Sequence, residues 1–82
     1  MNWTTSYNII CAHLARKGLK EYSEYLKEAF LIGATGGEIF DIAITRMIEL
    51  KRKGLLEDVS NNVIEIINYA KSIDHLNQDF EA

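Results

Sequence analysis

A helix must begin within the segment Gly33-Ala34-Thr35-Gly36-Gly37-Glu38-Ile39-Phe40. Thr35 and Glu38 have the spacing of a capping box, in which the threonine hydroxyl accepts a hydrogen bond from the N–H of Glu38 and the glutamate carboxylate accepts one from the N–H of Thr35. A run of basic residues and then Gly54 follow the apolar stretch, which is typical of a helix C-terminus. The segment therefore predicts a helix over about residues 36–53.

This predicted helix is apolar around most of its circumference. The apolar residues of its first half leave only a thin polar stripe, made by Asp41, Thr45, Glu49 and Arg52. A helix with such a small polar face has to pack against neighbours on several sides, so we expect it to be central in the fold.

Apolar residues at spacings of three and four predict three further helices. They cover about residues 5–17, 19–33 and 58–76. Asp58 or Ser60 is the expected N-cap of the last helix. A strand over residues 62–67 stays open as an alternative, because valine and isoleucine are frequent there. Residues 74–82 are mostly polar and can fray.

The composition supports one globular domain. The chain has 82 residues, of which 48% are hydrophobic, and a net charge of -3. This length allows one domain, and the apolar content is sufficient to form a core. We therefore expect residues 1–82 to form a single compact all-α domain of about four helices, arranged as a bundle.

Neither a membrane helix nor a secretory signal is visible in the sequence. No apolar run approaches the roughly 18 residues of a membrane helix, and the first residues lack the basic patch and apolar stretch of a signal peptide. The single cysteine, Cys11, has no partner for an internal disulfide, which fits a reducing compartment. We therefore expect the chain to be cytoplasmic.

The sequence holds little material for catalysis or metal binding. Cys11 and His13 are two residues apart, which places them on different faces of a helix, and His75 is expected near a solvated helix end. The glycines at 36–37 could hold a phosphate, but Glu38 places a carboxylate at the same helix N-terminus, so a capped turn is the preferred interpretation. We expect a non-catalytic protein with no cofactor and no metal site.

Charge is unevenly distributed along the chain. Residues 1–53 carry eight basic and six acidic side chains, whereas residues 54–82 carry one basic and six acidic ones. An acidic element of this kind repels nucleic acid and favours a basic protein partner, although the same charges could serve solubility alone. The predicted partner-binding residues are Glu57, Asp58, Asn61, Asn62, Glu65, Asn68, Ser72 and Asp74.

A resemblance to a known class of proteins points in the same direction. The run from Ile32 to Ile39, followed by an apolar helix with Arg46 and by lysine-rich residues, resembles a segment of small helical bacterial proteins encoded beside polymorphic toxins, among them immunity proteins of contact-dependent growth inhibition systems. It covers about twenty of the 82 residues. The resemblance implies an inhibitor that binds a cognate toxin domain, commonly a nuclease with a basic cleft, and blocks it by occlusion.

Two other interpretations stay open. In a helix-turn-helix-like DNA-binding or accessory regulator, Arg46 and the run Lys51-Arg52-Lys53 would contact phosphates, but the N-terminal end of the helix that would enter the groove is acidic and apolar. We therefore do not expect nucleic acid as a partner. A homodimer is the second alternative, because four short helices bury only a limited aromatic surface. The aromatic residues concerned are Trp3, Tyr22, Tyr25, Phe30 and Phe80.

Overall fold

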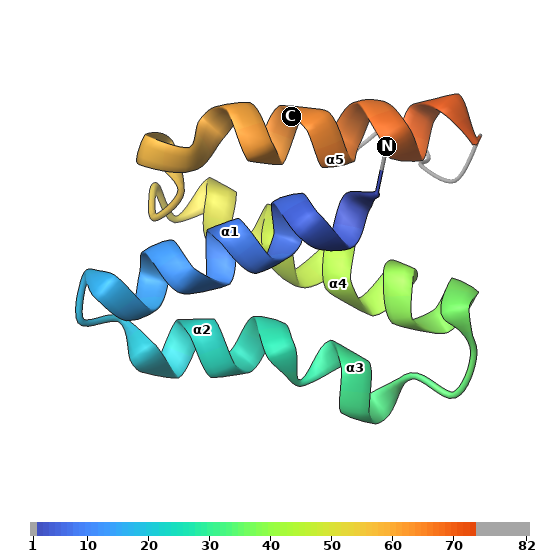
Figure 1. Cartoon of the computed structure of the whole chain (residues 1–82), viewed down its shortest axis with the longest axis horizontal. Coiled ribbons are helices and arrows are strands. Elements are labelled where there is room, and N and C mark those ends of the chain that lie inside the picture. Colours follow the sequence, from blue (N-terminus) through green and yellow to red (C-terminus); the bar gives the residue numbers. More distant parts are fainter. Residues whose placement is uncertain (1, 74–82) are drawn as a thin grey trace.

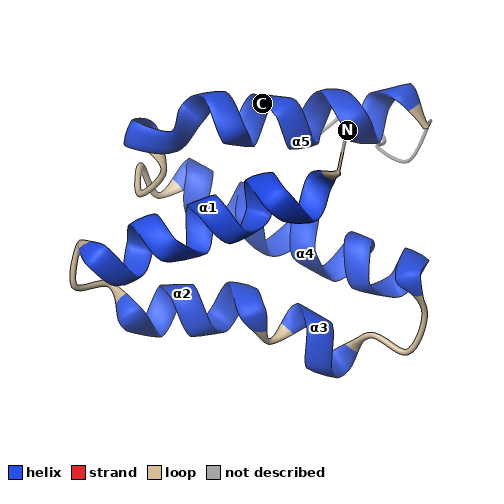
Figure 2. Ribbon diagram, viewed as in Figure 1, coloured by secondary structure: helices blue, strands red, loops and turns tan. Residues whose placement is uncertain are grey.

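The computed structural model describes residues 2–73, and all regular structure in this range is helical (Figures 1 and 2). The elements are α1 (Trp3–Arg16), α2 (Lys20–Lys27), α3 (Ala29–Ile32), α4 (Gly36–Arg52), the short 3-10 helix η1 (Glu57–Val59) and α5 (Ser60–Ser72). The prediction of a compact all-α domain is confirmed, and residues 62–67 belong to α5 rather than to a strand. The predicted fraying of residues 74–82 and the predicted end of the last helix lie outside the described residues.

Two helices form the middle of the bundle. α1 packs against α2 and α5, and α4 packs against α2, α3 and α5, so α1 and α4 lie between the α2–α3 pair on one side and α5 on the other (Figure 1). Their inward side chains are without exposed surface, as at Tyr7, Ile10 and Leu14 of α1 and at Met47 and Leu50 of α4. The helix that follows the capping box is thus part of the centre, a position that it shares with α1.

The capping box of α4 is formed as its spacing predicts. Thr35 Oγ1 accepts from the N–H of Glu38 at 3.1 Å, and Glu38 Oε1 accepts from the N–H of Thr35 at 3.2 Å. The same carboxylate oxygen accepts from the N–H of Ala34 at 3.0 Å. The N–H groups of Ala34, Thr35 and Glu38 are therefore satisfied by side chains of the same turn.

α1 and α4 end in the same way, on the repeated pattern Leu-x-Arg-Lys-Gly-Leu at residues 14–19 and 50–55. In each copy the glycine has a positive φ, 79° at Gly18 and 77° at Gly54. The leucine after each glycine donates its N–H to the carbonyl of the first leucine of the pattern, at 2.9 Å and 3.2 Å respectively. This is a Schellman ending, which needs the left-handed conformation that glycine adopts without strain.

The predicted start of α1 at residue 5 is wrong by two residues. The helix begins at Trp3, because the side chain of Asn2 accepts from the N–H of Thr4 at 3.0 Å and caps it. Asparagine is among the preferred residues at this position, and the cap places the helix start two residues earlier, so that Trp3 is included. Trp3 is thereby fixed on the helix and reaches the core.

The predicted cap of the last helix is also wrong. Neither Asp58 nor Ser60 caps α5, because the chain enters this helix through η1 and the N-cap residue, Val59, makes no side-chain cap hydrogen bond. The Asp58 carboxylate accepts instead from Lys17 Nζ at 2.9 Å. A contact with α1 has therefore replaced the local cap.

The helix predicted over residues 19–33 is interrupted between α2 and α3. In a continuous helix the carbonyls of Tyr25 and Leu26 would accept from the N–H groups four residues later. Arg46 Nη1 donates to the Tyr25 carbonyl, and the hydroxyl of Tyr7 donates to the Leu26 carbonyl, both at 2.7 Å. The prediction of one helix is therefore wrong, because side chains from α4 and α1 bind two of the carbonyls that a continuous helix would use.

Arg46 makes two further contacts at the junction between α2 and α3. Its Nη1 also donates to Glu28 Oε1 at 2.8 Å, and its guanidinium carbon lies 4.2 Å from the centre of the Tyr25 ring. Only 18% of the Arg46 side chain is exposed. Charge-assisted hydrogen bonds and a cation on an aromatic face are among the stronger polar contacts of a folded chain.

Gly54→Ala is expected to destabilise the fold by about 1 kcal/mol, because alanine adopts a left-handed φ only with strain. Gly37→Ala is the matched control, since Gly37 lies in the first turn of α4 and an added Cβ would meet only Thr35 Oγ1, at 4.0 Å. This second change should stabilise the fold by about 0.5 to 1 kcal/mol. Urea unfolding followed by circular dichroism measures both values, and equal destabilisation would contradict the assignment.

Arg46→Met is expected to lower the free energy of unfolding by about 1.5 to 3 kcal/mol, because it removes the charged donor from the Glu28 carboxylate and the Tyr25 carbonyl. Arg16→Met, at an exposed position of α1, should change stability by less than about 0.5 kcal/mol. Urea unfolding of the two variants gives the comparison. A loss at Arg46 no larger than the loss at Arg16 would refute the role of this contact.

Candidate protein-binding surface

α5 turns one face to the core and leaves outside a face that is polar apart from Ile64, which is 51% exposed. Val63, Ile66, Ile67 and Ala70 are buried, and the helical repeat places positions 61, 65, 68 and 72 on the other side. Among the predicted partner-binding residues of this helix, Asn62 is half-buried. The exposed ones are Asn61, Glu65, Asn68 and Ser72, which we call the α5 outer face.

Two residues of the α5 outer face also have partners within the chain. Glu65 Oε1 accepts from Ser6 Oγ of α1 at 2.9 Å, and Ser6 itself is buried. The hydroxyl of Ser72 donates to the carbonyl of Tyr69 at 2.7 Å. Glu65 is therefore held at a defined position on the surface, and the Ser72 hydroxyl retains only its acceptor capacity.

The two carboxylates of η1 differ in their surroundings. Asp58 Oδ2 lies 2.9 Å from Lys17 Nζ and 3.7 Å from His13 Nε2. The hydrogen bond from Lys17, together with the charge of this lysine, holds the pKa of the Asp58 carboxyl below its usual range. Glu57 is exposed beside it. Glu57 and Glu65 therefore supply most of the negative charge that an incoming partner would meet here.

Part of the predicted acidic surface lies outside the described residues. Among the predicted partner-binding residues, Asp74 lies outside the described range. Within residues 57–73 the carboxylates of Glu57, Asp58 and Glu65 are accompanied by the basic Lys71. On the described part of this surface, amide side chains are therefore as prominent as charged side chains.

Two side chains with ionisable groups, Cys11 and Tyr7, lie in the core. Cys11 is fully buried, and burial raises the pKa of its thiol to about 11, so the thiol is protonated at neutral pH and is a poor nucleophile. Burial likewise raises the pKa of the Tyr7 phenol, which serves as a hydrogen-bond donor to the α2 backbone. Over residues 2–73 no group of three or more histidine, cysteine, aspartate or glutamate side chains is placed to hold a metal ion.

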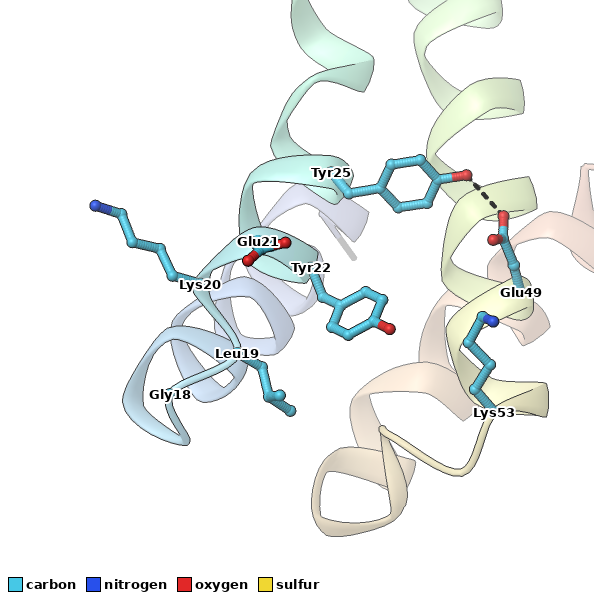
Figure 3. Close-up of a pocket in the computed structure, with 8 residues that line it drawn as sticks. All are labelled: Gly18, Leu19, Lys20, Glu21, Tyr22, Tyr25, Glu49 and Lys53. Atoms are coloured by element: carbon cyan, nitrogen blue, oxygen red, sulfur yellow. Dashed lines mark hydrogen bonds between the residues drawn. The ribbon is translucent and has the colours of Figure 1, made fainter.

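An open groove that sequence reasoning missed lies between α2 and the end of α4 (Figure 3). It has a volume of about 530 Å³ and is lined by Gly18, Leu19, Lys20, Glu21, Tyr22, Tyr25, Glu49 and Lys53. Tyr25 donates from its hydroxyl to Glu49 Oε1 at 2.7 Å across the groove, and this hydrogen bond raises the pKa of the phenol. Two lysines and two glutamates line the groove, so the lining selects no ligand of one charge.

Comparisons with protein-family models, with curated proteins and with solved structures found no match to this chain. The observations that bear on function are therefore the all-α bundle and the exposed polar face of α5. No helix in the part of the chain that the structure describes combines the length and the apolar character needed to cross a bilayer.

The contact between Lys17 and Asp58 is expected to make the stability of the fold depend on pH in the acid range. Because the pKa of Asp58 is lower in the folded chain than in the unfolded chain, the pair contributes stability above the unfolded value of about 3.9 and loses it as the pH falls through the folded value. Asp58→Asn should therefore lower the melting temperature at neutral pH but not in strong acid. Melting curves across this range test the expectation, with Glu57→Gln as the control for loss of an exposed carboxylate. A deficit of Asp58→Asn that persists into strong acid would contradict it.

Proposed function

We propose that this chain is a non-catalytic binding protein that inhibits a basic toxin or nuclease domain by covering its active-site cleft, as the resemblance to immunity proteins implies. The observation that carries the proposal is the α5 outer face together with Glu57, where exposed carboxylate and amide groups recur at spacings that bring them onto one side of a helix. We place this function in the cytoplasm, since the free thiol of Cys11 fits a reducing compartment.

The chemistry of this surface suits a basic cleft. Glu57 and Glu65 can accept hydrogen bonds from lysine or arginine side chains in the positions that the phosphate oxygens of a nucleic acid would occupy. Asn61 and Asn68 add neutral donors and acceptors around them. Asp58 contributes less, because Lys17 already lies 2.9 Å from its carboxylate.

The fold holds this surface in place before a partner arrives. Val63, Ile66 and Ala70 fix α5 on the core, and Ser6 of α1 holds Glu65. A surface that is ordered in advance loses less conformational entropy on association. A partner of opposite charge would also be steered toward it, which raises the association rate at low salt.

The alternative function is a DNA-binding or accessory regulator. The folded chain leaves it fewer of the phosphate contacts that the sequence predicts. Arg46 donates to the Tyr25 carbonyl and to Glu28, so this predicted phosphate contact is already used within the fold. Duplex DNA is therefore the control ligand in the experiment that follows.

The partner is sought with the tagged chain in an extract of the native cell, at low and at high salt, and bound proteins are identified by mass spectrometry. We expect a basic protein that is retained at low salt, is released at high salt and loses its activity when the chain is added. Recovery of the chain alone would overturn the proposal. Binding of random duplex DNA with a steep salt dependence would favour the regulator instead.

Glu57→Lys combined with Asn68→Lys is expected to weaken binding of the identified partner by at least about tenfold, because it places two cations against a basic surface. The matched control, Glu21→Lys with Thr45→Lys, makes the same change in net charge at exposed positions of α2 and α4. Calorimetric titration at low and high salt measures both affinities. Equal losses for the two pairs would mean that total charge governs binding, which contradicts a role for the α5 outer face.

A further inference from the structure

α3 exposes three consecutive apolar side chains. The exposed fractions are 38% for Phe30, 85% for Leu31 and 53% for Ile32, whereas Ala29 is buried. Keeping such a row of apolar side chains in water is unfavourable, and contiguous exposed apolar surface marks an interaction site. We call Phe30, Leu31 and Ile32 the α3 apolar patch.

The fold holds the α3 apolar patch in its exposed position. Phe30 stacks on Trp3, with ring centroids 5.9 Å apart and planes inclined by 4°. The chain is tightly packed directly after the patch, since a Cβ at Gly33 would lie 2.5 Å from Ile39 Cγ1. The junction before the patch is held by Arg46 through the Tyr25 carbonyl. The patch therefore belongs to an ordered part of the surface on both sides.

Charges of opposite sign flank the α3 apolar patch. Toward α4, Ile32 lines a small hollow together with Glu38 and Asp41. Toward α2, Lys27 is exposed at the C-terminal end of that helix, and the neighbouring Glu28 carboxylate is paired with Arg46. Figure 1 shows α3 between the end of α2 and the start of α4. A surface with one acidic edge and one basic edge becomes complementary to itself after a two-fold rotation.

We propose that a second copy of this chain binds the α3 apolar patch, in a two-fold symmetric dimer with Leu31 of both copies at its centre and Lys27 of one copy facing Asp41 of the other. A second copy fits this surface because it supplies both the apolar centre and the reversed order of charges. The patch is small compared with the interfaces of stable dimers, so the association is expected to be weak. The dimer uses no residue of α5 or η1 and stands independently of the proposed function.

Sedimentation velocity from micromolar to millimolar concentrations tests the dimer. The unchanged chain should show a sedimentation coefficient that rises with concentration, and Leu31→Asp should weaken self-association by at least about tenfold, because it would bury an unpaired carboxylate. Ile64→Asp is the matched control, since Ile64 is an apolar residue of α5 with 51% exposure. A monomer at every concentration, or equal effects of the two variants, would overturn the proposal.

Exchanging the charges tests the arrangement of the two copies. Lys27→Glu and Asp41→Lys should each repel their own copies, whereas an equimolar mixture should form a heterodimer in which both contacts again join opposite charges. Circular dichroism establishes that each variant keeps its helices. Helical variants that associate no better in the mixture than alone would exclude this arrangement.

Discussion

The fold depends on the binding of two backbone carbonyls at the end of α2 by side chains from other helices. The hydroxyl of Tyr7 in α1 donates to the Leu26 carbonyl, and the guanidinium of Arg46 in α4 donates to the Tyr25 carbonyl. These hydrogen bonds join α1, α2 and α4 at one level of the bundle, and loss of either donor would leave a polar backbone group without its partner. The same contacts end α2, so that α3 can take a separate course beside the start of α1 and α4.

This dependence on distant side chains explains which parts of the fold the sequence predicts. The capping box of Thr35 and Glu38 and the glycine ending at Gly54 act within a few residues, so their patterns were sufficient. Helical periodicity reports which face of a segment is apolar, but it does not report which carbonyl a remote side chain will bind. The donor and acceptor of the Tyr7–Leu26 hydrogen bond are 19 positions apart, and the interruption after α2 was therefore missed.

The candidate surface also has some features that follow from the local sequence and others that depend on distant side chains. The outward positions of Asn61 and Asn68 follow from the apolar repeat of α5, and both are exposed. The internal partners of Asp58 and Glu65 are 41 and 59 positions away in sequence, so only the folded chain shows that these two carboxylates also hold α1. The charge count of the segment was readable from the sequence, whereas the share of that charge open to a partner was not.

α1 supports both of the surfaces proposed for binding. Its first residue, Trp3, stacks on Phe30 of the α3 apolar patch, and Ser6, one turn further along, holds Glu65 of the α5 outer face. Because α1 packs between α2 and α5, the two surfaces lie on different sides of the bundle (Figure 1). A dimer formed through α3 would therefore leave the α5 outer face of each copy open. Two such faces on one assembly would raise the apparent affinity for a partner with two sites without any new contact, provided that the geometry lets both bind at once.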